Sequence, residues 1–295
     1  MVVARTNDAC VEGFSPHARL RFLYSDVSET AAKLQIQHGN CLASGSVLAR
    51  ALAGIALVGI DLGEQDETIS MHAEVNGRVG GFFAEMTGRG ELRGYTHNTD
   101  FDELPPPEPD IPDPCGTVAR VKLTRTHESG RIRSQMSFSV SPASEQNILV
   151  EFYNATMQIP TQVCLHAAAF DNRIERARAL AVQLMPDGRK SDFKRISALF
   201  SDGTVSEQLE YDASVNTLRE IFELPDLTTG PTRALAFGCT CSQSVAEASY
   251  ATRSKPELDG LVRTARPQTF RCHLCGKVYT LTPEKLFQLA LAAKT

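Results

Sequence analysis

The stretch Thr68-Ile-Ser-Met-His-Ala-Glu-Val-Asn-Gly-Arg-Val-Gly-Gly-Phe-Phe-Ala-Glu-Met86 determines the fold class that we expect. Apolar and polar residues alternate from Thr68 to Val75, which predicts a strand with one buried face. Asn76-Gly77 is a strong signal for a two-residue hairpin turn, so the return strand is expected from Val79 to Met86. More strand-like segments follow along the chain, and together they predict a largely antiparallel sheet.

Segments on either side of this stretch predict helices that pack on the sheet. Apolar residues at helical spacing from Val47 to Ile60 predict a buried core helix that is too short for a membrane span. A second helix is expected behind Ser144, a suitable N-cap. Strand-like runs over 159–169 and 174–185 complete an N-terminal core domain of residues 1–185, which we expect to be α+β.

Residues 186–231 are expected to form short amphipathic helices. One apolar face follows Ser191, a possible cap, and a second ends at Leu224-Pro225. Isolated helices of this length are marginal in water, so both need a surface on which to dock. The segment is therefore expected to be a metastable helical linker, although an ordinary helical connector fits the pattern as well. The apolar residues of the two faces are Phe193, Ile196, Leu199, Phe200, Val215, Leu218, Ile221 and Phe222.

Four cysteines near the C-terminus form two close pairs, Cys239-Thr-Cys241 and Cys272-His-Leu-Cys275, separated by a long loop. Two such pairs supply the four thiolates that a tetrahedral zinc ion (Zn²⁺) needs. An iron–sulfur cluster remains open from the sequence alone. His273 is a weaker ligand candidate, because four thiolates already complete the tetrahedron. We expect a small C-terminal zinc-binding domain of residues 232–295.

This C-terminal segment has few apolar residues with which to build a core. Small domains of about 60 residues are marginal on apolar burial alone. A structural zinc ion contributes on the order of 10 to 16 kcal/mol of apparent binding free energy, so its loss is expected to unfold the segment. A disulfide across the one-residue spacer of Cys239 and Cys241 closes only with local strain, and strained disulfides are the reversible ones. The pattern therefore favours a redox switch over a static brace.

Length, composition and charge narrow the possible functions. The chain has 295 residues, 42% hydrophobic and 22% charged, with a formal net charge of -5. These values are ordinary for a globular protein of about two domains, and the acidic balance weighs against nucleic-acid binding. The first residues lack the apolar core of a secretory signal. We expect a cytoplasmic protein that neither spans a membrane nor binds nucleic acid.

Two alternatives use the same cysteines differently. A constitutive zinc-ribbon protein that binds nucleic acid would keep the metal as a permanent brace and contact phosphates through Arg263, Arg266, Arg271 and Lys277. A zinc hydrolase or deaminase needs an open coordination position, which four cysteines close. The sequence also lacks a phosphate-binding loop of the G-x-x-x-x-G-K-[ST] type. We therefore expect a protein that is not an enzyme.

The cysteine pairs and several upstream segments resemble the redox-regulated 33 kDa heat-shock chaperone family. The upstream matches are Met71 to Met86, Glu91-Leu-Arg-Gly-Tyr95 and Gln158-Ile-Pro-Thr161, in the family's order and over nearly the whole chain. Thr156-Met157 stands where the family has Ser-Glu. The four-cysteine motif is the most specific part of the resemblance.

The resemblance implies an ATP-independent holdase that is inactive when reduced and zinc-bound. In that family oxidation forms disulfides within the two close pairs, Cys239 with Cys241 and Cys272 with Cys275, and zinc leaves. The C-terminal domain and the linker then unfold, and apolar surface binds unfolding or oxidatively damaged client proteins as part of an oxidative stress response. The oxidised protein is expected to be a homodimer. The client-binding residues are expected to be Phe193, Ile196, Leu199, Phe200, Leu218, Ile221 and Phe222.

The remaining histidines and cysteines are expected to be ordinary surface or packing residues. Of the cysteines outside the four-cysteine motif, Cys115 follows a proline-rich loop and is expected to be the most accessible. The others are Cys10, Cys41 and Cys164, and the histidines are His17, His38, His72, His97, His127 and His166.

Overall fold

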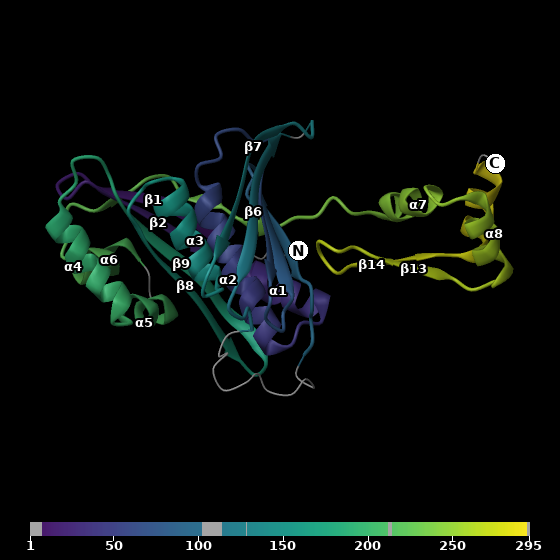
Figure 1. The fold of residues 1–295 in the computed structure, drawn as a ribbon, viewed down its shortest axis with the longest axis horizontal. Coiled ribbons are helices and arrows are strands. Elements are labelled where there is room, and N and C mark those ends of the chain that lie inside the picture. Colours follow the sequence, from purple (N-terminus) through teal and green to yellow (C-terminus); the bar gives the residue numbers. More distant parts are fainter. Residues whose placement is uncertain (1–7, 102–113, 128, 212–213, 294–295) are drawn as a thin grey trace, which may run out of the picture. The chain divides into compact units, whose positions relative to one another are not determined.

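The computed structural model describes residues 8–101, 114–127, 129–211 and 214–293 (Figure 1). The chain forms two compact units, residues 1–238 and residues 239–295. The larger unit confirms the expected α+β architecture, because it combines helices with two mostly antiparallel sheets. The proline-rich loop that precedes Cys115 lies largely outside the described residues, so it stays a prediction.

Two sheets form the framework of the larger unit. Sheet A contains, in spatial order, β10 (Thr228–Thr229), β1 (Ala9–Ser15), β2 (Leu20–Asp26), β9 (Arg173–Leu184) and β8 (Thr161–Phe170), and β11 (Arg233–Ala234) also pairs with β1. Sheet B contains β12 (Ala236–Phe237), β5 (Glu91–Thr96), β4 (Gly81–Thr87), β3 (Glu67–Val75), β6 (Ala119–His127) and β7 (Ile132–Val140). The alternation predicted from Thr68 to Val75 is confirmed in β3, where Met71 and Ala73 are buried and Glu74 is exposed.

The turn between β3 and β4 differs from the predicted two-residue hairpin. The Val75 amide donates to the Gly80 carbonyl, so the loop runs from Asn76 to Val79. The Asn76 side-chain oxygen accepts hydrogen bonds at 2.9 Å from the amides of Thr117 and Val118. These contacts with a distant segment hold Asn76 in place and override the local preference of the Asn-Gly pair for a tight turn.

Helices fill the space between the two sheets (Figure 1). The predicted buried helix is α2 (Leu42–Gly59), which contacts strands of both sheets, and α1 (Ser28–His38) packs beside it. Among the described residues α2 is long and apolar enough to cross a membrane, but a core helix passes the same test, and 78% of α2 is buried. The expected cap of α3 (Glu145–Glu151) is confirmed, because the Ser144 side chain accepts a hydrogen bond from the Asn147 amide. A π-helical turn, η1 (Phe152–Thr156), continues α3.

Three helices lie on the face of sheet A that is turned away from α2 (Figure 1). They are α4 (Lys190–Ser201), α5 (Thr204–Tyr211) and α6 (Val215–Ile221). The predicted cap of α4 is wrong: Arg189 is the N-cap and Ser191 lies inside the first turn. The sequence analysis also missed α5, which is short and buries only Val205 and Leu209.

The chain after α6 runs along the edges of both sheets. The strands β10 and β11 pair with β1, and β12 pairs in parallel with β5. We call residues 228–238 the edge segment. The guanidinium of Arg233 ties this segment to the C-terminal end of α2 through hydrogen bonds of 3.1 Å to the carbonyls of Gly59 and Leu62.

The smaller unit contains three helices and a hairpin. They are α7 (Gln243–Ala251), α8 (Lys255–Arg263), β13 (Gln268–Arg271), β14 (Val278–Leu281) and α9 (Pro283–Ala292). Side chains cap all three helices: Ser242 accepts from the Val245 amide, Thr282 accepts from the Lys285 amide, and Ser254 and Glu257 form a capping box at the start of α8. The buried apolar cluster of this unit consists of Ala246, Tyr250, Tyr279, Leu281 and Leu286.

Candidate metal centre

The structure brings the four predicted cysteine thiols together in the smaller unit. The sulfurs of Cys239, Cys241, Cys272 and Cys275 all lie within 4.8 Å of one another, and none is in a disulfide. The Sγ atoms of Cys239 and Cys272 are 3.8 Å apart, and those of Cys241 and Cys275 are 3.3 Å apart. Four sulfurs placed about 2.3 Å from one zinc ion lie about 3.8 Å from each other in a tetrahedron. The donor set and its spacing therefore fit a tetrahedral metal ion.

The second cysteine pair lies in the tight turn that joins β13 to β14. The Cys272 amide donates to the Lys277 carbonyl at 2.9 Å, and the Gly276 amide donates to the Cys272 carbonyl at 2.8 Å. Gly276 has a φ of 72°, in the left-handed region that glycine adopts at low cost. This turn points both thiols to the same side, while Cys239 and Cys241 approach from the segment before α7.

Tyr279 on β14 is a residue of this site that the sequence analysis missed. Its hydroxyl lies 2.9 Å from the Cys241 carbonyl and 3.2 Å from the Cys241 sulfur, to both of which it donates. Burial raises the pKa of the Cys241 thiol, but the Tyr279 hydroxyl and the neighbouring thiols lower it further than burial raises it. A single tyrosine two residues after the Gly276-Lys277 turn carries no motif, so only the three-dimensional structure identifies it.

The surroundings of Cys272 and Cys275 disfavour the negatively charged thiolate form when no cation is bound. Burial raises the pKa of both Cys272 and Cys275, and for Cys275 the hydrogen-bonded thiols around it raise it further. A bound cation reverses this preference and holds coordinating thiols as thiolates. A metal ion at this centre would therefore supply the positive charge that stabilises the thiolates, which the surrounding protein groups do not supply.

Other residues considered from the sequence do not belong to the centre. His273 is exposed and does not belong to the four-sulfur group. The four cations of the nucleic-acid alternative, Arg263, Arg266, Arg271 and Lys277, are all exposed.

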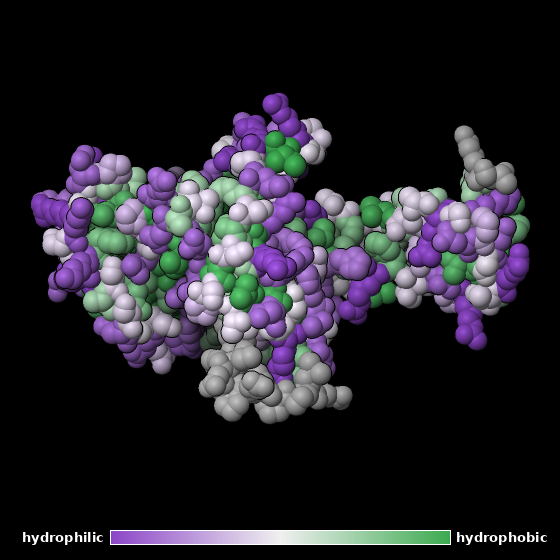
Figure 2. All heavy atoms as spheres, viewed as in Figure 1, coloured by the Kyte–Doolittle hydropathy of each residue, from purple (hydrophilic) through white to green (hydrophobic). Residues whose placement is uncertain are grey.

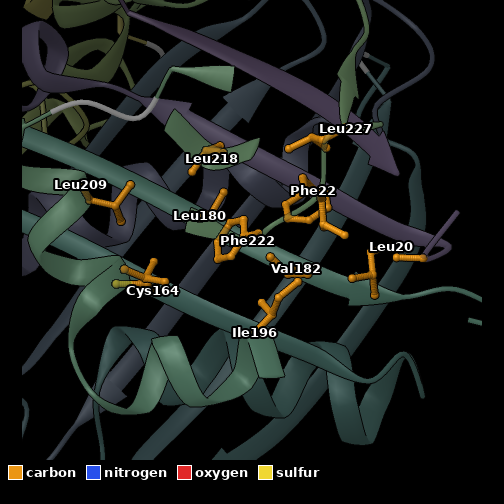
Figure 3. Packing of buried hydrophobic residues seen from close by; sticks show 13 residues of the cluster. Leu20, Phe22, Cys164, Leu180, Val182, Ile196, Leu209, Leu218, Phe222 and Leu227 are labelled. Atoms are coloured by element: carbon orange, nitrogen blue, oxygen red, sulfur yellow. The ribbon is translucent and has the colours of Figure 1, made fainter. Parts of the chain in front are cut away.

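Six of the seven residues predicted to bind clients lie in one apolar cluster between the linker helices and sheet A. Ile196, Leu218 and Phe222 are buried there, and Phe193, Leu199 and Phe200 are partly buried against the same cluster. In Figure 3, Phe222 lies among Phe22, Leu180 and Ile196, and its ring centroid is 5.5 Å from that of Phe22. Ile221 is partly exposed and lies outside this cluster.

Polar contacts also hold the linker helices to sheet A. The ring of His166 on β8 contacts the Glu210 carboxylate at 2.6 Å. Arg178 on β9 donates to the Leu209 carbonyl at 2.8 Å, which satisfies the C-terminal end of α5. Figure 2 shows hydrophilic residues at the outer margin of this region, mixed with paler and hydrophobic ones.

The remaining cysteines differ from expectation at one position. Cys115 was expected to be the most accessible, but it is fully buried, because the backbone around it packs against the loop at Gly77. Cys10 and Cys164 are buried as well, and Cys41 is partly exposed.

The histidines also include an unexpected pair: the rings of His72 and His97 lie side by side, with their centroids 5.6 Å apart.

Comparisons with known proteins agree over nearly the whole chain. The family model described as Hsp33 protein matches residues 8–282. The 33 kDa chaperonin of Deinococcus radiodurans is 24% identical and covers 95% of this chain and 97% of its own length. That of Symbiobacterium thermophilum is 26% identical, with 88% of each chain covered.

A solved structure shows the same fold. The 33 kDa chaperonin of Thermotoga maritima, a heat shock protein 33 homolog, has a TM-score of 0.81 with this chain at 21% sequence identity. The match covers 97% of this chain and 98% of the other. The family match, the collinear relatives and the four-cysteine centre agree with one another, and the chain belongs to the Hsp33 family of heat-shock chaperones.

Proposed function

We propose that this protein is a redox-regulated, ATP-independent holdase whose inactive form carries a zinc ion on Cys239, Cys241, Cys272 and Cys275. The observation that carries the proposal is the placement of four thiols within 4.8 Å of one another in a unit with a very small core. Zinc suits this donor set better than harder cations, because thiolates are soft ligands. Binding, and not catalysis, is the proposed activity.

Energetics support the proposal that the metal ion keeps the smaller unit folded. The cluster of the smaller unit has five buried members, and two other apolar residues of this unit, Val245 and Val278, are about half exposed. A fully buried apolar side chain contributes about 1.5 to 3 kcal/mol, before the ordering of the chain is subtracted. Five such side chains contribute about 7.5 to 15 kcal/mol before that subtraction. Once the ordering of the chain is subtracted, the roughly 10 to 16 kcal/mol of a structural zinc ion exceeds what this cluster supplies. Loss of the ion is therefore expected to unfold residues 239–293.

Oxidation is the proposed trigger for loss of the ion. Two thiolates give up two electrons to a peroxide and form one S–S bond, while the O–O bond breaks and its oxygens leave as water after taking up protons. The resemblance to the family assigns the disulfides to Cys239 with Cys241 and to Cys272 with Cys275. A disulfide sulfur carries no thiolate charge, so the ion loses its ligands and dissociates.

The linker helices are the proposed client-binding element. Unfolding of the C-terminal domain is expected to loosen the edge segment and then the short helices α4 to α6, which are marginal when undocked. Their apolar side chains, with the face of sheet A beneath them, then become available to unfolding client proteins. We propose a functional division into residues 1–185, 186–231 and 232–295, a homodimer in the oxidised state, and the cytoplasm as the place of action.

A parallel measurement of metal and activity tests this proposal. The reduced, zinc-loaded protein is treated with peroxide at mildly elevated temperature, and zinc release is followed with a chromophoric chelator. Suppression of client aggregation is measured on the same samples. Both signals are expected to rise together and to be reversed by dithiothreitol with zinc. Full activity of the reduced, zinc-loaded protein would contradict the switch, and salt-dependent nucleic-acid binding without any effect on aggregation would favour the zinc-ribbon alternative.

A further inference from the structure

We propose that His72 and His97 form a second metal site, on the exposed face of sheet B, for a divalent transition-metal ion of the class that prefers imidazole ligands. Their Nε2 atoms lie 3.4 Å apart. Two imidazole nitrogens bound at about 2.0 to 2.1 Å to one tetrahedral ion lie about 3.3 to 3.4 Å from each other. The two rings therefore already have the spacing of a ligand pair.

The fold builds this pair across three strands. His72 lies on β3 and His97 directly follows β5, with β4 between them. The His97 amide donates to the Gly81 carbonyl on β4 at 2.9 Å. A Cβ atom at Gly81 would come within 2.7 Å of the His97 ring and within 2.5 Å of the Ala73 carbonyl oxygen. Glycine at this position thus leaves room for the His97 ring.

Neighbouring groups hold the His97 ring in a ligating orientation. The Nδ1 and Cε1 atoms of the ring are the ones nearest to Gly81, and Nε2 is the nitrogen that faces His72. Nε2 is therefore the nitrogen placed to bind an ion shared with His72. Tyr95 stacks on the His97 ring at 6.0 Å, and Phe83 stacks on Tyr95 at 5.6 Å. Burial, and then the neighbouring His72, lower the pKa of His97, which favours the neutral ring that a metal needs.

The site is open to solvent, and its surroundings carry both signs of charge. One surface hollow is lined by His72 and Glu74, and a second by Glu74 and His97. Glu74 borders both hollows and offsets the charge of a cation. Arg120 also borders both and opposes it, so we expect a modest affinity, with water completing the coordination. His72-Ala73-Glu74 is an H-x-E triplet in the sequence.

Cobalt binding to the full-length protein tests the site. The tag-free, reduced chain is loaded with one equivalent of zinc, which the four thiolates bind in preference to two imidazoles and hold more tightly than they would hold Co²⁺. The sample is then dialysed against Co²⁺, and both metals are measured. We expect one Co²⁺ per chain with unchanged zinc, and paramagnetic broadening of the His72 and His97 ring signals in NMR spectra.

Matched histidine variants locate the ion. His72→Gln and His97→Gln are each expected to weaken Co²⁺ binding at least about tenfold. His127→Gln serves as the control, because His127 lies beside Glu64 and Asp66 in a separate group of possible ligands and is expected to leave binding unchanged. Co²⁺ taken up only in exchange for zinc, or binding that His127→Gln abolishes while the other two variants retain it, would overturn the proposal.

Discussion

The hydroxyl of Tyr279 donates a hydrogen bond to the sulfur of Cys241 over 3.2 Å, and this contact links the hairpin of the smaller unit to its first cysteine pair. Partners of metal ligands typically change metal affinity by about 10- to 100-fold when they are removed. Tyr279→Phe keeps the ring in the apolar cluster and removes the hydroxyl. We expect zinc affinity to fall by about tenfold and zinc to be released at lower peroxide concentrations, as measured by competition with a chelator.

Tyr250→Phe is the matched control for this prediction. Tyr250 belongs to the same buried cluster, but its hydroxyl donates to the Thr269 carbonyl at 3.1 Å and contacts no cysteine. Removal of the Tyr250 hydroxyl breaks this hydrogen bond and is expected to lower the free energy of unfolding by about 0.5 to 1.5 kcal/mol, with little change in zinc affinity. Equal losses of zinc affinity in both variants would show that Tyr279 acts through packing alone.

The contact between Phe22 and Phe222 provides a test of linker docking. Phe22→Ala removes the ring from the sheet A side and leaves every linker side chain in place. Truncation of a buried phenylalanine costs about 3 to 5 kcal/mol, so α4 to α6 are expected to undock more readily. We expect partial suppression of client aggregation by the reduced protein, with its zinc retained. Phe170→Ala, at a side chain that is 71% exposed, is the control and is expected to behave like the unaltered protein.

Cys164 reports on the same undocking through its reactivity. It lies in the cluster under the linker helices, where burial raises its pKa to about 11. At pH 8 the thiolate is therefore scarce, and iodoacetamide is expected to label the partly exposed Cys41 before Cys164. After peroxide treatment and removal of the oxidant, Cys164 is expected to become reactive, while Cys115, buried away from these helices, stays protected. Peptide mass spectrometry measures both, and an active holdase with an unreactive Cys164 would argue against linker release.

Arg233 offers a test of the edge segment. Its two hydrogen bonds to carbonyls at the end of α2 each contribute about 1.5 to 3 kcal/mol if they behave as bonds to a charged group do. Arg233→Ala is expected to lower the peroxide concentration at which aggregation suppression appears. Arg19→Ala, which removes an exposed ion pair with Asp187 at 3.6 Å, is expected to change little. If both variants begin to suppress aggregation at the same peroxide concentration, the edge segment does not take part in activation.

Local patterns predicted those parts of the structure whose partners lie nearby in the sequence. The alternation in β3, the apolar spacing of α2 and the Ser144 cap each follow from a single segment, and all three are confirmed. The close approach of the four cysteine thiols followed from their spacing and the known geometry of thiolate sites. In each of these cases the sequence shows a periodicity or a motif that is typical of one local structure.

Apart from the short helix α5 and the N-cap of α4, the parts that sequence reasoning missed depend on distant contacts. The side chain of Asn76 accepts hydrogen bonds from the amides of Thr117 and Val118, and no local sequence pattern predicts these contacts. The edge segment forms strands of two residues, too short to show alternation. Tyr279 and the His72–His97 pair become neighbours of their partners only after the strands have paired. These are tertiary features, and a single sequence does not encode them in any local spacing.

Hydrogen–deuterium exchange before and after peroxide treatment tests the central claim most directly, namely that one metal ion keeps the C-terminal unit folded and the linker docked. The account predicts that amides of residues 239–293 lose protection together as zinc leaves, and that those of α4 to α6 follow. The framework strands β2, β3 and β9 are predicted to stay protected. A peroxide-treated protein that suppresses aggregation while residues 239–293 remain protected and zinc-bound would contradict it.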